Sequence, residues 1–365
     1  MSTGERAGTQ LAEPELRIWR DNVRTEVREQ LGEFVRGECV RRLDGAGVEV
    51  AGELLCSFLD GGKYVRSTFM YLGWLCGAAE DAAALRASAS LELLHTFALI
   101  QDDVMDGSSL RRARPTAHVV FARWHRDRAL AGSADRFGES AAILLGDLCL
   151  VWAEEMLRRS GIGADALARV LPRYDDMRTE LAVGQLSDLL NSCQTFPTLT
   201  EVLDVLRRKS GNYTVRRPLE LGAAMAGCGV EVAGALSGYG AAIGEAFQLR
   251  DDILGVFGSP AQTGKPARTD LEAGKATSVV VAAYELAEPG VRRQLAELMR
   301  SPEIDADGVD RWRTLIAASG AVQWIEDLIG QRHDAALRFL DGAPIPDIPR
   351  TALAEMAVAC TQRAA

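Results

Sequence analysis

Apolar residues recur every three or four positions through most of this 365-residue chain, beginning near Glu15. The first run carries apolar side chains at Leu16, Trp19, Val23, Val27, Leu31 and Phe34. This spacing places them on one face of an α-helix, whereas a half-buried strand needs strict alternation. Long alternating patterns are missing, so the sequence predicts an all-α fold.

Three later segments are apolar on nearly every side, which is typical of helices enclosed by other helices. They are residues 89–101, 140–152 and 219–226. Because 47% of the residues are hydrophobic, the chain can bury a substantial core. We predict a disordered N-terminus at residues 1–14 and a single large helical bundle at residues 15–365.

The charge balance and the cysteine usage exclude several classes of protein. An excess of acidic over basic residues, 51 against 41, argues against nucleic-acid binding, which needs clustered Lys and Arg. No apolar stretch approaches the roughly 20 residues that span a bilayer, and the first residues lack the apolar core of a signal peptide. The seven cysteines form no CxxC pair and fit a reducing compartment. We expect a cytoplasmic protein without a membrane span or a zinc site.

Two groups of aspartates stand far apart in the sequence, each in an apolar helical run: Asp102, Asp103 and Asp106, and then Asp251 and Asp252. Residues four apart share a helix face, so Asp102 and Asp106 point the same way while Asp103 points elsewhere. Like charges on one face repel each other and call for a cation. Magnesium prefers oxygen ligands and is usually held by one or two carboxylates plus substrate phosphates. The two groups therefore indicate one magnesium-held diphosphate site.

A third acidic pair, Asp175 and Asp176, lacks an acid four residues after its first member, so we interpret it as a solvated helix surface. The first group differs because Arg111 and Arg112 follow it closely. Acids followed by guanidinium groups are typical of a site for a metal-bound anion.

With these residues in place, the chain resembles the trans-isoprenyl diphosphate synthases. The first group matches the family's aspartate-rich motif, with its DDxxD acids and the arginine pair that follows. Further segments match in the family's order, namely Gly61-Gly62-Lys63-x-x-Arg66, Glu92-x-x-His95, Gly146-Asp147, Gly184-Gln185, Lys209-Ser210, Phe247-Gln248-x-x-Asp251-Asp252, Gly264-Lys265-Pro266 and Gly274-Lys275.

The resemblance implies an isoprenoid-synthase bundle whose central helices surround a deep apolar cavity. It implies a head-to-tail condensation of isopentenyl diphosphate with an allylic diphosphate (dimethylallyl, geranyl or farnesyl) after ionisation assisted by Mg²⁺, three ions with substrate bound. Asp102, Asp106 and Asp251 would be the metal ligands, with Asp103 and Asp252 also in the catalytic centre. The resemblance further implies a homodimer.

The same resemblance assigns the cationic and polar residues to two substrates. Those around the allylic diphosphate would be Arg111, Lys209, Gln248, Lys265 and Lys275, with Lys209 and Lys265 also catalytic, and Ser210 would also bind substrate. Those holding isopentenyl diphosphate would be Lys63, Arg66, His95 and Arg112. His95 precedes Asp102 by about two helical turns, so both fall on nearly the same helix face.

The chain departs from the family pattern at a few positions. Gly255 replaces a frequent third aspartate, so the second metal-binding segment rests on Asp251. Ser67 replaces a proline, Gln101 stands where histidine is common, and Ala276 follows Lys275 in place of arginine. None of these changes removes an essential charge.

Product length depends on the helix that precedes Asp102, because a growing chain would run down it at about 1.5 Å per residue. Ala98 leaves room one turn below Asp102, whereas Phe97 on the neighbouring ridge is bulky and Leu94 lies deeper. A lone aromatic at the position of Phe97 resembles geranylgeranyl-type synthases, so we expect a C20 product. C15 and C25 products remain open.

Two other functions share part of the pattern. A class I terpene cyclase also ionises an allylic diphosphate on an aspartate-rich helix, but it should lack an isopentenyl diphosphate site. A non-catalytic partner subunit of a heteromeric synthase would tolerate the loss at Gly255. The retained acids Asp102, Asp106 and Asp251, with Arg111, argue against that second alternative.

Overall fold

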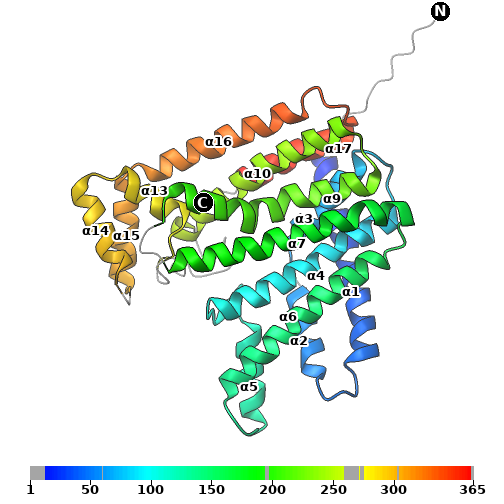
Figure 1. Ribbon diagram of the computed structural model, residues 1–365, viewed down its shortest axis with the longest axis horizontal. Helices are drawn as coiled ribbons and strands as arrows, with labels where there is room; N and C mark the ends of the chain where they lie inside the picture. The colour runs from blue at the N-terminus through cyan, green and yellow to red at the C-terminus, as the bar shows by residue number, and fades with distance from the viewer. Residues whose placement is uncertain are drawn as a thin grey trace, which may run out of the picture.

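The computed structural model describes residues 13–59, 61–193, 197–258, 271, 275–301 and 304–362. It confirms the all-α prediction, since helices carry nearly all of the ordered backbone in these ranges. The predicted disordered segment, residues 1–14, lies mostly outside the described residues. Figure 1 shows long helices running side by side across the molecule, with α14 and α15 grouped at one end.

The N-terminal half supplies the first wall of the bundle. Its elements are α1 (Glu13–Arg42), α2 (Glu49–Leu59), α3 (Val65–Leu75), α4 (Ala82–Met105), β1 (Leu110–Arg111), β2 (Arg114–Pro115), α5 (Ala117–Asp127), α6 (Ala134–Arg158) and α7 (Ala164–Ser192). The strands β1 and β2 form a two-residue antiparallel ladder directly after α4.

The C-terminal half supplies the opposite wall and an outer layer. Its elements are α8 (Leu199–Leu206), the π-helix η1 (Arg207–Arg216), α9 (Arg217–Ala226), α10 (Val230–Phe257), α13 (Ser278–Leu286), α14 (Pro289–Met299), α15 (Ala306–Ala318), α16 (Ala321–Leu340) and α17 (Asp347–Thr361). The last helix packs on α10, α16 and α3, where Tyr239 donates a hydrogen bond of 2.6 Å to the Leu353 carbonyl.

Close helix packing explains why small residues interrupt the apolar runs. A side chain at Gly222 of α9 would put its Cβ only 1.9 Å from the Met70 carbonyl oxygen of α3. A side chain at Gly73 would likewise strike the Leu219 carbonyl. These two glycines let α3 and α9 approach each other, so the predicted burial of residues 219–226 is largely confirmed.

Helix α4 bears on the expectation that the chain has no membrane span. Over Ala82–Met105 it is long and apolar enough to cross a membrane, which the sequence-based prediction denied. However, 67% of its apolar window is buried against other helices of this chain. Its Asp81 cap accepts a hydrogen bond from the Ala84 amide, and Leu91, Leu93 and Leu94 are fully buried. A central helix of a water-exposed bundle passes the same test, so α4 is weak evidence for a membrane span.

Helix α6 corrects the prediction that residues 140–152 are buried on every side. Its inner face packs on α4 and α5, with Cys149 and Trp152 almost fully buried. Its outer face leaves Ile143, Leu144 and Val151 exposed, Leu144 by 68%. Apolar periodicity alone cannot distinguish a helix face that is buried within the chain from an apolar face that is exposed on its surface.

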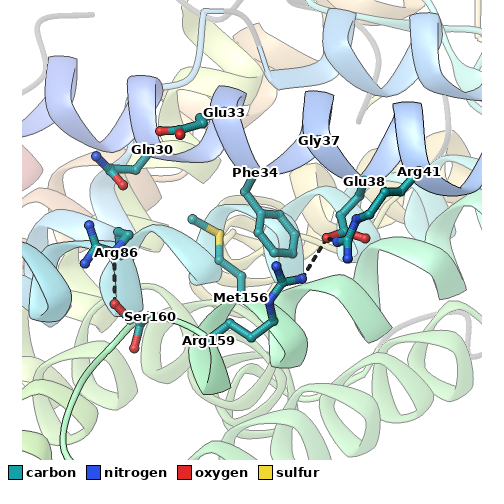
Figure 2. A pocket seen from close by; sticks show the side chains of 10 residues that line it. All are labelled: Gln30, Glu33, Phe34, Gly37, Glu38, Arg41, Arg86, Met156, Arg159 and Ser160. Atoms are coloured by element: carbon teal, nitrogen blue, oxygen red, sulfur yellow. Dashed lines mark hydrogen bonds and ion pairs between the residues drawn. The ribbon is translucent and has the colours of Figure 1, made fainter.

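A cavity of about 470 Å³ lies between α1, the first turn of α4 and the last turn of α6 (Figure 2). Buried Glu38 projects toward it and is neutralised by Arg41, Arg42 and Arg159, the last at 2.9 Å. Phe34 and Met156 line its middle. Because its carboxylate is already paired with arginines, Glu38 ties α1 to α6 as a structural link.

Candidate functional site

A second cavity, of about 580 Å³, lies between the end of α4 and the helices α7, η1 and α10. Residues of both aspartate groups line it, together with most of the predicted cationic and polar residues. These residues are Arg66, His95, Asp102, Asp106, Arg111, Lys209, Ser210, Gln248, Asp251, Asp252 and Lys275. Residues far apart in the sequence therefore share one cavity, as the two-wall interpretation requires.

The first wall is built by the way α4 ends. The helix stops at Met105, Asp106 is its C-cap, and Gly107 takes a left-handed conformation at φ 62° that favours glycine. The hairpin of β1 and β2 then turns the chain back toward the acids. As a result, the Arg111 guanidinium donates to both carboxylate oxygens of Asp103 at 2.7–2.9 Å.

This arrangement separates the roles of the three acids. Asp103 is 1% exposed and paired with Arg111, so it orients that guanidinium and does not line the cavity. Asp102 and Asp106 both line the cavity, as their four-residue spacing predicts.

Lys209 occupies the centre of the site and comes from the π-helix η1. Its ammonium donates to Asp102 at 3.1 Å and to Asp188 of α7 at 2.7 Å. A side chain at Gly184 would place its Cβ 2.6 Å from the Lys209 amide nitrogen, so a glycine there lets η1 pack against α7. Wide π-turns recur at functional sites because they change the direction in which side chains project.

Asp188 is a site residue that the sequence interpretation missed. It lies one turn after Gly184 and Gln185, which the motif comparison singled out, and Gln185 itself donates to Asp102 at 3.4 Å. The four-residue helical spacing from Gly184 was the signal that could have identified it.

Opposing charges set the protonation states at this wall. Burial alone would raise the pKa of Asp102, but Lys209, Lys275 and Arg111 outweigh it and hold that pKa below its usual range. Burial would lower the pKa of Lys209, but Asp102 and Asp188 outweigh it and raise that pKa. Both groups are therefore charged at neutral pH, as a site for a metal-bound anion requires.

The second wall is the C-terminal half of α10. Asp251 lines the cavity, while its neighbour Asp252 accepts hydrogen bonds from the Ser278 amide at 3.1 Å, the Ser278 hydroxyl at 2.6 Å and the Gln248 side chain at 3.0 Å. Asp252 thus anchors the start of α13 to α10. The segment that precedes α13 carries Lys275, whose ammonium pairs with Asp106 across the cavity.

A second group of predicted residues, Arg66 and His95, lines the cavity beside Tyr213. Arg66 donates to the Thr214 hydroxyl at 2.9 Å and lies 4.5 Å above the Tyr213 ring. His95 faces the same ring, at 6.3 Å between centroids. Burial, with Arg66, Arg111 and Arg112 nearby, lowers the pKa of His95 well below its ordinary value, so the imidazole is neutral.

Ser67, a departure from the family pattern, contributes to the placement of this group. Its hydroxyl donates to Glu92 at 2.7 Å and its amide at 3.1 Å. Glu92 precedes His95 by one turn of α4, so Ser67 fixes the start of α3, with Arg66, against α4.

Besides Asp103, four predicted residues within the described ranges lie outside the lining of this cavity. Lys63 and Arg112 are exposed. Partial burial of the Arg112 guanidinium is the largest cause that lowers its pKa, and the nearby charges of Arg111 and Arg66 lower it further. Leu94 is fully buried, and Phe97 packs against the core, whereas Ala98 does line the cavity. Lys265 falls outside the described residues.

The donor chemistry of the cavity fits magnesium. Within the described ranges, no three His, Cys, Asp or Glu side chains are grouped closely enough to hold a metal ion by themselves. Magnesium does not need such a cage, because it takes one or two carboxylates and completes its shell with water and substrate phosphates. Asp102 and Asp106 on one wall and Asp251 on the other supply carboxylate oxygens to the same cavity.

Comparison with known proteins gives a consistent result. The model of the polyprenyl synthetase family matches residues 49–315. The curated geranylfarnesyl diphosphate synthase of Aeropyrum pernix is 33% identical over 303 residues, which cover 82% of this chain and 89% of the relative. The geranylgeranyl diphosphate synthase of Mycobacterium tuberculosis is 32% identical over 290 residues, 79% of this chain and 77% of the relative.

A solved structure extends the similarity to the fold. The geranylgeranyl pyrophosphate synthase from Corynebacterium glutamicum, complexed with isoprenyl diphosphate and magnesium, has a TM-score of 0.90 and 37% identity. The alignment covers 94% of this chain and 99% of that one.

Proposed function

This chain belongs to the polyprenyl synthetase family as a trans-prenyl diphosphate synthase, and we propose that it condenses isopentenyl diphosphate with allylic diphosphates to make geranylgeranyl diphosphate. One observation supports locating the reaction in this cavity: the acids of α4 and α10 line it together with Lys209, Arg111 and Lys275. Acids and cations in one cavity are what a metal-bound diphosphate needs.

In this proposal, Asp102, Asp106 and Asp251 hold Mg²⁺ together with the allylic diphosphate. Bound Mg²⁺ neutralises charge on the departing diphosphate. Lys209 and Lys275, which pair with these acids in the structure, turn their ammonium groups toward the diphosphate oxygens when it binds. Fixed cations stabilise the charge that develops as the carbon–oxygen bond breaks.

The part of the cavity lined by Arg66 and His95 suits the second substrate. Arg66 provides a cation, and Arg112 and Lys63 lie on the neighbouring segments. Apolar side chains, including Ala98, Leu99 and Leu181, line the same cavity. They keep water from the allylic cation until the double bond of isopentenyl diphosphate attacks it.

The experiment is to incubate the purified chain with Mg²⁺, radiolabelled isopentenyl diphosphate and allylic primers of increasing length, and to size the products. We expect chain growth to a C20 product that requires both Mg²⁺ and isopentenyl diphosphate. A cyclic hydrocarbon made without isopentenyl diphosphate would identify a terpene cyclase instead. Turnover only after addition of another chain would identify a partner subunit.

The C20 assignment rests on the α4 side chains below Asp102. Ala98 lines the cavity, and Phe97 beside it is partly buried against the core. We expect Phe97→Ala to lengthen the product by about one five-carbon unit, because loss of the ring beside Ala98 leaves space below the site, where one helix turn rises about 5.4 Å. Mass spectrometry of the products measures this. Phe34→Ala, which removes a partly buried ring near the other cavity, is the control; an unchanged profile for Phe97→Ala would refute the assignment.

We also propose a homodimer joined through the outer face of α6. Ile143, Leu144 and Val151 expose apolar surface there, which water disfavours and a second copy can cover. We expect Leu144→Lys to halve the molar mass measured by light scattering. Leu286→Lys, at an exposed leucine of α13, should leave the mass unchanged. A wild-type monomer would contradict this proposal.

A further inference from the structure

Two of the seven cysteines meet where α1 packs on α2. Cys39 of α1 and Cys56 of α2 lie close enough that a charge on one thiol acts on the other. Gly52, one turn before Cys56 on the same face of α2, also faces Cys39, since a Cβ at Gly52 would lie 3.2 Å from the Cys39 sulfur. The packing of the two helices thus holds both thiols in one small space.

The two thiols differ in access and in reactivity. Cys56 is exposed, whereas Cys39 is partly buried. Burial, followed by the proximity of Cys56 and Asp44, raises the pKa of Cys39 to about 11. A thiolate is the attacking species in disulfide exchange, so an external oxidant meets Cys56 first and Cys39 acts second.

The end of α2 is connected to the substrate site. Tyr64 donates a hydrogen bond of 2.7 Å to the carbonyl of Leu59, the last residue of α2 and one turn beyond Cys56. Tyr64 itself has a left-handed backbone at φ 49° and stands between Lys63 and Arg66. A displacement of α2 is therefore passed directly to the segment that carries these two cations.

We propose that Cys39 and Cys56 form a reversible disulfide that draws α2 toward α1 and weakens the binding of isopentenyl diphosphate. The effect on binding rests on the proposed function, whereas the disulfide does not. With oxidised glutathione as the oxidant, the Cys56 thiolate attacks one glutathione sulfur and releases the first glutathione. Cys39 then attacks the Cys56 sulfur and releases the second, and the two cysteine protons pass to the two glutathione thiolates. A disulfide fixes its sulfurs about 2.05 Å apart and holds the two Cα atoms within about 4.4–6.8 Å, so the link locks the spacing of α2 from α1.

The first test maps the disulfide in the full chain by mass spectrometry after treatment with oxidised glutathione. We expect a linked pair of Cys39 and Cys56 peptides in the wild type, and a persistent glutathione adduct on Cys56 in Cys39→Ser. Cys193→Ser, which removes another exposed cysteine, should form the same link as the wild type. A wild-type chain that keeps a glutathione adduct on Cys56 without the link would overturn the proposal.

The second test compares reduced and oxidised enzyme. We expect oxidation of the wild type to raise KM for isopentenyl diphosphate several-fold, to leave KM for the allylic diphosphate unchanged, and to be reversed by dithiothreitol. Cys56→Ser should show no such change. If the disulfide forms in the oxidised wild type but KM for isopentenyl diphosphate stays unchanged, the proposed effect of the disulfide on binding is refuted. Absence of turnover in the reduced enzyme would instead refute the proposed function and leave the mapped disulfide standing.

Discussion

Replacing Asp102 with asparagine is expected to lower kcat by about 10³-fold, the upper range for loss of one preorganised electrostatic group in an active site. Asp102 is the acid at which the site's charges converge, since Lys209 and Arg111 both contact it. The amide removes the negative charge that would hold Mg²⁺ but keeps the shape of the side chain. Steady-state rates with saturating allylic and isopentenyl diphosphates measure the loss.

The control for this variant is Asp175→Asn, which changes an exposed acid of the third pair that forms an ion pair with Arg178. It should keep wild-type rates. Circular dichroism and thermal unfolding should be nearly unchanged in both variants, because Lys209 keeps its contact with Asp188 when Asp102 is altered. A near-wild-type kcat for Asp102→Asn would refute the metal-binding role.

Replacing Asp251 with asparagine should cause the second-largest loss, about 10²- to 10³-fold in kcat. On α10 the neighbouring acid is already engaged by Ser278 and Gln248, and Gly255 stands where a third acid is frequent. Asp251 lines the cavity, and we expect it to be the acid of this wall that binds the metal ion. The Mg²⁺ concentration for half-maximal rate should rise as well.

Asp252→Asn is the matched comparison, because the amide oxygen still accepts from the Ser278 hydroxyl. We expect a smaller loss of rate than for Asp251→Asn. If Asp252→Asn cost more than Asp251→Asn, the two residues would have the opposite roles.

The sequence was most informative where one pattern had one physical cause. Helical periodicity predicted the bundle, and the spacing of Asp102 and Asp106 predicted that both face the cavity, because helix geometry is local. Asp103 behaved as its position required and turned away, into a pairing with Arg111.

It was less informative where contacts join distant segments. The contact of Asp188 with Lys209 and that of Ser278 with Asp252 became visible only when η1 and α13 were placed beside their partners. Cys39 and Cys56 share no sequence motif, and a helix hairpin alone brings them together. The sequence predicted that the outer face of α6 is buried, whereas the structure leaves it exposed. The apolar pattern of a helix does not tell whether a given face is covered by the same chain.

The central claim is that two walls of acids share magnesium with one diphosphate. Titration calorimetry with inorganic diphosphate, with and without Mg²⁺, tests it without any turnover. We expect the wild type to bind at least about tenfold more tightly with Mg²⁺, equal to about 1.4 kcal/mol. Asp102→Asn and Asp251→Asn should each lose that gain. Magnesium-dependent binding that persists unchanged in Asp251→Asn would contradict the shared site.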